Sequence, residues 1–236
     1  GAGGHLAGCA LAVTVLSERL AEVRSQIDAA CSAAGRTSDE VRLLAVTKTR
    51  PAQTVRDAYE LGCRWFGENR LQELRDKATD LADLEDARWS VIGHVQRNKA
   101  AVVVAVAAEL QSLDSLELAA ELDRRLEEAG RTLDVLVQVN TSGEASKSGL
   151  TVEGVEEFVE GLRMYPRLVP KGLMTIALPS PDDREVAACF VRLVSVQHRL
   201  QSSDGGDWRE LSMGMSGDFA RAIACGATCV RIGSAL

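Results

Sequence analysis

A lysine ends the first apolar run of strand character in this chain, at a position suited to covalent chemistry. The run reads LLAVTK, from Leu43 to Lys48. Leu44, Val46 and Lys48 share one face of a strand, so an apolar face ends on an amine. A partly desolvated amine is a competent nucleophile toward a carbonyl group. The simpler interpretation is a lysine whose stem packs along the strand end while its amine stays in water.

Small and hydroxylated residues near the C-terminus form a second set, suited to binding an anion. Ser216 directly precedes a predicted helix in GMSGDFARAI, and Gly233 and Ser234 follow a predicted strand in VRIGS. A serine hydroxyl and a bare glycine backbone both offer donors to a phosphate. A helix N-cap and a turn glycine produce the same pattern without a ligand. Arg231 shares strand parity with Gly233, and a buried arginine needs a partner, for which Asp114 is the structural candidate.

Two further residues compete for a chemical role. Lys171 lies in the predicted strand LVPKGLMTI and is a candidate for a Schiff-base aldolase without a cofactor. It lies near the start of that strand, however, whereas Lys48 ends its own. His94 ends the predicted strand RWSVIGH. It is a candidate base, or a structural histidine held by hydrogen bonds.

The elements that carry these residues alternate regularly between strand and helix. A first helix is predicted from Leu16 to Cys31 by apolar residues at steps of three and four, and Gly35 ends it. About eight strands follow, separated by helices, which indicates right-handed crossover units and a parallel sheet. This number of units predicts an α/β fold, a single (β/α)₈ TIM barrel with an extra N-terminal helix. A doubly wound open sheet is the alternative, but no G-x-G-x-x-G follows the first strand.

A barrel brings the C-terminal ends of its strands together at one face. Lys48, Ser216 and Gly233 all follow strand ends and therefore meet there. A lysine that captures a carbonyl beside a phosphate site fits one cofactor well, pyridoxal 5′-phosphate. We expect residues 14–236 to form this cofactor-binding barrel and residues 1–13 to be a loose N-terminal extension.

Composition restricts the other functional classes. The chain has 236 residues, of which 46% are hydrophobic, and a net charge of -7. An acidic protein is a poor partner for nucleic acid or an anionic membrane, so neither is expected. The six cysteines contain no C-x-x-C pair and are interpreted as reduced thiols of a cytoplasmic protein, not as metal ligands.

Several blocks of the sequence resemble one known family. The blocks, in order, are LLAVTKT, FGENRLQE, WSVIGHVQRNKA, QVNTSGEASKSG, GLMTI, LSMGMSGDFARAI and VRIGSAL. They are similar to the signature blocks of the YggS/PROSC family of pyridoxal 5′-phosphate homeostasis proteins. That family resembles the barrel domain of alanine racemase without its second, β-rich domain.

The resemblance implies a role for individual residues. Lys48 matches the lysine that forms the covalent aldimine, a Schiff base with the cofactor. Ser216, Gly233 and Ser234 match the phosphate-binding positions, and Arg231 matches the arginine that faces the pyridine nitrogen. Two further residues match positions that line the pocket: Asn69 and Met213. Arg97 and Gly217 depart from the usual family residues, and Arg97 is expected to affect what the pocket mouth admits.

The function implied is that of a pyridoxal phosphate carrier in cofactor and amino-acid homeostasis. No catalytic residue and no metal are expected, and apoenzymes that use pyridoxal phosphate are candidate recipients. We expect a monomer or a weak dimer. A racemase-type enzyme on the same barrel is the alternative. Alanine racemases use a tyrosine from the second domain as a further acid/base, and the tyrosines of this chain, Tyr59 and Tyr165, lie in predicted helices away from the barrel mouth.

Overall fold

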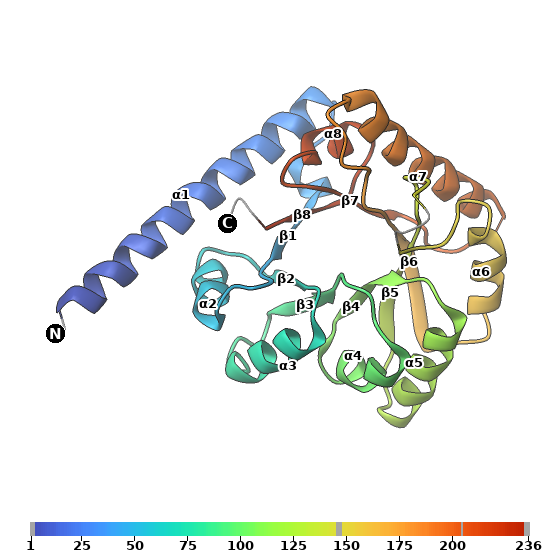
Figure 1. Ribbon diagram of the computed structural model, residues 1–236, viewed down its shortest axis with the longest axis horizontal. Helices are drawn as coiled ribbons and strands as arrows, with labels where there is room; N and C mark the ends of the chain where they lie inside the picture. Colours follow the sequence, from blue (N-terminus) through green and yellow to red (C-terminus); the bar gives the residue numbers. More distant parts are fainter. Residues whose placement is uncertain (1–2, 145–147, 204, 234–236) are drawn as a thin grey trace.

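A closed barrel of parallel strands forms the centre of the protein, and helices cover its outside (Figure 1). The computed structural model describes residues 3–144, 148–203 and 205–233, with the backbone alone for residues 3–12. Among the described residues there are eight strands in the order β1 to β8, and β1 pairs with β8 to close the barrel. The predicted (β/α)₈ architecture is confirmed.

The strands are short, as is usual for this fold. Their bounds are β1 Arg42–Val46, β2 Trp65–Glu68, β3 Arg88–Val91, β4 Glu109–Leu113, β5 Leu133–Gln138, β6 Leu168–Met174, β7 Glu210–Met215 and β8 Cys229–Ile232. Every neighbouring pair is parallel, and the register slips in β4·β5, β5·β6 and β7·β8. Parallel strands joined through helices leave all strand C-termini at one end of the barrel.

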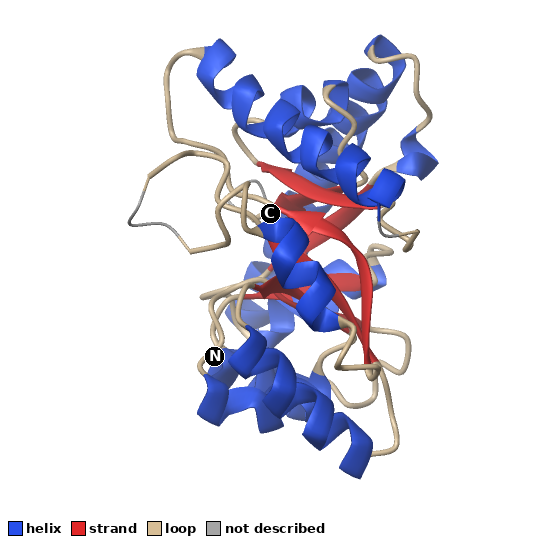
Figure 2. Cartoon of the chain, turned by 90° about the vertical axis from the view of Figure 1, so that its right-hand side faces the viewer, coloured by secondary structure: helices blue, strands red, loops and turns tan. Residues whose placement is uncertain are grey.

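Helices follow most strands and lie on the outside of the barrel (Figure 2). Their bounds are α1 Gly3–Ala33, α2 Ala52–Glu60, α3 Leu71–Asp80, α4 Ala100–Val106, α5 Leu116–Glu128, α6 Val155–Leu162, α7 Asp183–Ser203 and α8 Phe219–Ala224, with short 3-10 turns at Ser38–Glu40 and Arg97–Lys99. α5 shows the local logic. Ser115 caps it by accepting a hydrogen bond from the Leu118 N–H, and Leu118, Leu122 and Leu126 are buried at helical spacing.

The first helix is longer than the apolar spacing predicted. It begins at Gly3, and its N-terminal half extends beyond the barrel in Figure 1. Leu16, Leu20, Val23, Ile27 and Cys31 are buried, as their spacing predicted. Residues 3–13 are thus the first turns of α1, and the division into an extension and a barrel at residue 14 stays a prediction. No helix among the described residues is both long and apolar enough to cross a membrane.

A polar network fills part of the barrel interior. The Glu109 carboxylate accepts hydrogen bonds from Arg42 Nη2 at 3.0 Å and from Ser90 Oγ at 2.6 Å. Gln111 Nε2 also donates to Glu109, and the Gln111 side-chain oxygen accepts from Ser212 Oγ, each at 2.6 Å. These interior polar groups therefore have partners, as buried polar groups require.

Candidate functional site

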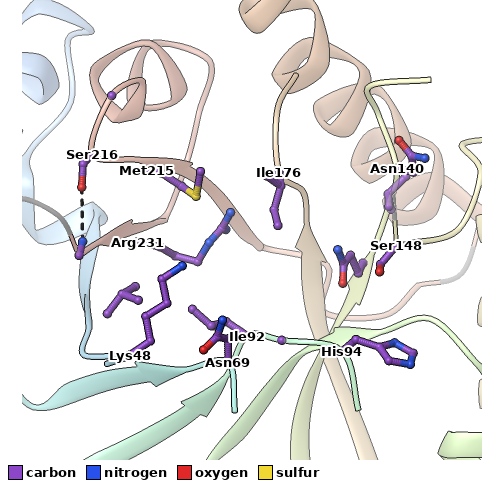
Figure 3. Close-up of a pocket in the computed structure, with 16 residues that line it drawn as sticks. Lys48, Asn69, Ile92, His94, Asn140, Ser148, Ile176, Met215, Ser216 and Arg231 are labelled. Atoms are coloured by element: carbon purple, nitrogen blue, oxygen red, sulfur yellow. Dashed lines mark hydrogen bonds between the residues drawn. The ribbon is translucent and has the colours of Figure 1, made fainter. Parts of the chain in front are cut away.

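A pocket of about 560 Å³ opens at the C-terminal end of the barrel strands (Figure 3). Its walls are formed by Val46, Lys48, Asn69, Ile92, Gly93, His94, Gln138, Val139, Asn140, Ser148, Ile176, Met215, Ser216, Gly217, Arg231 and Gly233. The volume is that of a small-molecule site. The residues come from the ends of seven strands, all but β4, so the barrel does bring Lys48, Ser216, Arg231 and Gly233 to one cavity.

Lys48 lies in the turn that follows β1, two residues beyond the last strand residue, Val46. The sequence predicted that the strand would continue to the lysine, and it left open whether the amine is partly desolvated or stays in water. The structure corrects the strand end, which is at Val46, and it shows the Lys48 side chain exposed in the pocket wall. Figure 3 shows the side chain rising from the pocket floor, with its amine pointing toward Arg231.

Arg231 is the buried charge of the pocket. Its guanidinium donates to Ser212 Oγ at 2.8 Å and to the Thr175 carbonyl oxygen at 2.7 Å. Burial lowers the pKa of the Arg231 guanidinium below its usual value. Asp114, the expected ion-pair partner, instead accepts from the Gly149 N–H at 3.0 Å. Both of these hydrogen-bond partners are neutral, so the positive charge of Arg231 is available to the pocket.

Ser216 and Gly233, the two described residues that the sequence predicted to bind an anion, lie together at one corner of the pocket. The Gly233 N–H donates to Ser216 Oγ at 3.4 Å, which is long for such a bond. Gly217 lines the same corner with its bare backbone. Ser234, the third residue expected here, lies outside the described residues.

The C-terminal end of β7 requires a glycine where α8 packs on it. Gly214 has φ +95, and a Cβ there would lie 2.6 Å from the Ala222 Cβ and 2.9 Å from the Phe219 Cα. No side chain fits so close to backbone, so α8 packs directly on the end of β7 only because residue 214 is glycine. This close packing places Met215 and Ser216 at the pocket rim.

Met213 was expected to line the pocket, and the structure places it in the hydrophobic core instead, fully buried. Met215 lines the pocket and is 43% exposed. The pairing of β7 with β8 slips in register between Ser212 and Met215, in the same stretch of the strand. The expectation for Met213 came from the family resemblance alone.

Asn69 lies in the pocket wall, and its backbone packs closely against Gly93 in the neighbouring turn. A Cβ at Gly93 would lie 2.3 Å from the Asn69 carbonyl oxygen, so the turns after β2 and β3 touch only through a bare backbone. His94 also lines the pocket and is exposed.

Two residues singled out by the sequence lie elsewhere. Lys171 is absent from the pocket wall, and its charge acts on Asp134 and Glu210. Arg97, expected at the pocket mouth, lines a separate surface groove with Glu117 and Tyr165. Neither residue contributes to the site that contains Lys48.

Several wall residues were not assigned a role from the sequence: Ile92, Gln138, Asn140, Ser148, Ile176 and Met215. Their signal was their place at strand ends, inside blocks such as GLMTI that the sequence analysis singled out. Ile176 is an exposed apolar side chain, and with Ile92 and Met215 it offers an apolar surface to a flat ring.

The arrangement combines three chemical elements. Lys48 supplies a primary amine for a carbonyl, Ser216 and Gly233 supply a neutral corner for an anion, and Arg231 supplies a cation between them (Figure 3). Among the described residues, no group of three or more His, Cys, Asp or Glu side chains is arranged to hold a metal ion.

Comparison with known proteins gives consistent family matches. The family model for the alanine racemase N-terminal domain matches residues 19–236. The pyridoxal phosphate homeostasis protein of Pseudomonas aeruginosa is 42% identical over 224 residues, covering 95% of both chains. That of Aquifex aeolicus is 39% identical over 221 residues, covering 93% of this chain and 96% of the relative.

Solved structures agree with this. The structure of PipY from Synechococcus elongatus with pyridoxal phosphate bound is similar with a TM-score of 0.83 and 35% identity, covering 94% of this chain and 99% of that chain. An alanine racemase of Clostridium difficile has a TM-score of 0.73 at 14% identity, with 93% of this chain and 55% of that chain covered. At that identity the likeness concerns the fold alone.

Proposed function

Because this chain belongs to the family of pyridoxal phosphate homeostasis proteins, built on the alanine racemase N-terminal-domain barrel, we propose that it holds pyridoxal 5′-phosphate covalently on Lys48. The observation that carries the proposal is the meeting of Lys48, Arg231 and the Ser216–Gly233 corner in one cavity. The cofactor, when bound, supplies an aldehyde, a phosphate and an aromatic ring that withdraws electrons.

The residues present fit this group. In its unprotonated form the Lys48 amine attacks the aldehyde carbon, and its two hydrogens leave with the carbonyl oxygen as water. Ser216 Oγ and the Gly233 N–H, already 3.4 Å apart, turn to the phosphate as two neighbouring donors. Ile92, Ile176 and Met215 exclude water from the ring faces.

Arg231 determines what kind of chemistry the pocket favours. A guanidinium does not give up its proton at ordinary pH. Opposite the ring nitrogen, Arg231 therefore keeps that nitrogen unprotonated and makes the ring a weaker electron sink than a carboxylate partner would. The pocket is suited to holding the cofactor more than to breaking bonds on it.

The acid/base tyrosine of alanine racemases has no tyrosine counterpart among the described residues of the pocket wall, where His94 is the remaining candidate base. Tyr59 donates to Asp86 from α2, and Tyr165 lines the surface groove beside Arg97. Losing one positioned acid/base typically lowers a rate by about 10²–10⁴-fold. We therefore propose a carrier of the cytoplasm that passes the cofactor to apoenzymes and does not itself turn over amino acids.

Borohydride reduction tests the attachment. Reduction of the holoprotein should fix the pyridoxyl group to the peptide that contains Lys48, as read by mass spectrometry of a digest. A label on Lys171 would contradict the assignment.

Chiral chromatography tests the carrier role. Holoprotein incubated with L-alanine should yield negligible D-alanine. Turnover on the order of one per second, lost in Lys48→Ala, would favour the racemase-type alternative over the carrier.

A further inference from the structure

The turn that carries Lys48 is fixed on both sides of the lysine by groups from β2 and α3. On one side, Thr47 Oγ1 donates to Glu68 Oε1 at 2.6 Å, and Lys77 Nζ donates to the Thr47 carbonyl oxygen at 2.7 Å. On the other side, the Thr49 N–H donates to Glu73 Oε2 at 2.8 Å. Residues 47 and 49 are therefore held, while the side chain of Lys48 between them lines the pocket.

A buried ion pair lies at the centre of this anchor. Lys77 Nζ is 2.6 Å from Glu68 Oε1, and the two side chains are 8% and 0% exposed. Burial raises the pKa of the Glu68 carboxyl, and the bonds from Lys77 and Thr47 oppose that rise. An apolar pair of similar volume often stabilises a core as well or better, so stability alone is a weak reason for charges here.

Part of the Glu68 carboxylate has no partner. Glu68 Oε2 is buried and makes no hydrogen bond to any described residue. A buried acceptor without a donor is unfavourable. The orientation of Glu68 is thus set by its two bonds through Oε1, both of which lead to the residue before Lys48.

Thr49 adds a conformational argument. It has φ +63, and it is the sole non-glycine with a positive φ among the described residues. A β-branched residue rarely adopts this conformation, which persists only where its surroundings hold it. Glu73 stabilises this conformation by accepting a hydrogen bond from the Thr49 N–H. The backbone after Lys48 therefore keeps a positive φ that a threonine rarely adopts without such support.

We propose that Glu68, Lys77 and Glu73 are positioning residues that fix the direction in which the Lys48 amine enters the pocket. The proposal rests on the proposed attachment of pyridoxal phosphate to Lys48. Attack on the aldehyde carbon requires the amine at near-contact distance and along a defined direction. A displacement of about 1 Å at such a site can lower a rate by about a hundredfold.

The variants must separate positioning from folding. Glu68→Met/Lys77→Met removes both charges of the buried pair together. The Glu73 carboxylate, 3.5 Å from Lys77 Nζ and 25% exposed, then keeps its bond from the Thr49 N–H. Glu73→Ala removes the second anchor from a partly exposed helix position and remains informative if the double variant does not fold. Arg131→Met is the matched control. It removes three hydrogen bonds to backbone carbonyls outside the pocket wall, those of Val104, Ala107 and Thr132.

Two measurements on each variant distinguish the roles. The first is the rate at which pyridoxal phosphate becomes attached to Lys48, from timed borohydride quenching and mass spectrometry. The second is the affinity for pyridoxine 5′-phosphate, which carries the phosphate and ring but no aldehyde. We expect attachment to slow by about tenfold to a hundredfold in both anchor variants, while pyridoxine phosphate affinity changes less than about twofold. Arg131→Met should change neither.

Amide hydrogen exchange of the cofactor-free protein gives an independent readout. The amides of residues 47–50 should exchange faster in the anchor variants and at the normal rate in Arg131→Met. An unchanged attachment rate would overturn the positioning role. So would a decrease in pyridoxine phosphate affinity as large as the decrease in the attachment rate. Failure of the wild-type protein to attach the cofactor at Lys48 would instead contradict the proposed function itself.

Discussion

Ser216→Ala isolates the phosphate corner from the rest of the site. In the structure Ser216 Oγ makes one long bond, 3.4 Å from the Gly233 nitrogen, and the residue is only half-buried. Removing the hydroxyl should therefore change the free energy of unfolding by no more than about 0.5 kcal/mol. Any large effect of the substitution must then come from the ligand.

The expected effect on binding follows from the charge of the phosphate. A hydrogen bond to a charged group contributes about 1.5–3 kcal/mol. Its loss corresponds to a decrease in affinity of about tenfold to a hundredfold. Pyridoxal, which lacks the phosphate, offers no charged partner to Ser216 and should lose less than about twofold.

Equilibrium dialysis with both ligands measures this difference, and Gly217→Ala provides the control. A Cβ at Gly217 meets no atom within 4 Å, so that variant changes the same corner without removing a donor. If Ser216→Ala weakens pyridoxal and pyridoxal phosphate equally, Ser216 does not contact the phosphate and the reasoning fails.

Three further predictions concern the lysine, the glycine contact and the second anchor. Lys48→Ala should abolish the yellow colour of the holoprotein, because the covalent link is lost, while circular dichroism stays unchanged because the side chain is exposed. Gly93→Ala should lower the free energy of unfolding by about 1–3 kcal/mol or more in urea titrations, because its Cβ would lie 2.3 Å from the Asn69 carbonyl oxygen; a neutral result would show that the two turns separate freely. The Thr49 N–H lowers the pKa of Glu73 below 4.5, so ionised Glu73 stabilises the folded state above pH 4.5 and this contribution is lost as the pH falls through the folded-state pKa. Urea titrations should accordingly show a deficit of Glu73→Ala against wild type that is full above pH 4.5 and disappears in more acidic solution, and a deficit independent of pH would contradict it.

The sequence was sufficient to predict the barrel because its signals are local and repeated. Alternating strands and helices, each with turn residues at its ends, specify parallel crossover units without any knowledge of distant contacts. The site residues followed from the same rule, since Lys48, Ser216, Arg231 and Gly233 all lie at strand ends. Strand ends meet at one face in any barrel, whatever the details of its packing.

The errors arose where pairing between strands decides the outcome. Met213, which the family resemblance placed in the pocket, is buried in the core, and Met215 lines the pocket beside a register slip between β7 and β8. A register slip is a property of two strands and cannot be predicted from one. Lys48 proved exposed because β1 ends at Val46. The Glu68–Lys77 pair was missed for a related reason. In sequence Lys77 is one charged residue among several in RLQELRDK, and only the approach of α3 to the Lys48 turn makes it buried.

The buried guanidinium of Arg231 depends on the polar interior of the barrel. Arg231 is held by the Ser212 hydroxyl, Ser212 donates to Gln111, and Gln111 donates to Glu109. Glu109, at the far end of this series, carries a negative charge and forms an ion pair with Arg42. Arg231 is hydrogen-bonded to Ser212 and to the Thr175 carbonyl oxygen, not to Glu109.

Each hydrogen bond in this series, from Glu109 to Arg231, fixes the direction of the next. The Ser212 hydroxyl donates its hydrogen bond to Gln111, so its oxygen is free to accept a hydrogen bond from Arg231. This bond fixes the position of the guanidinium. The series thus orients Arg231 without neutralising it. An arginine held in this way keeps its charge for whatever lies above it, as expected where that partner is the ring nitrogen of a bound cofactor and not a carboxylate of the protein.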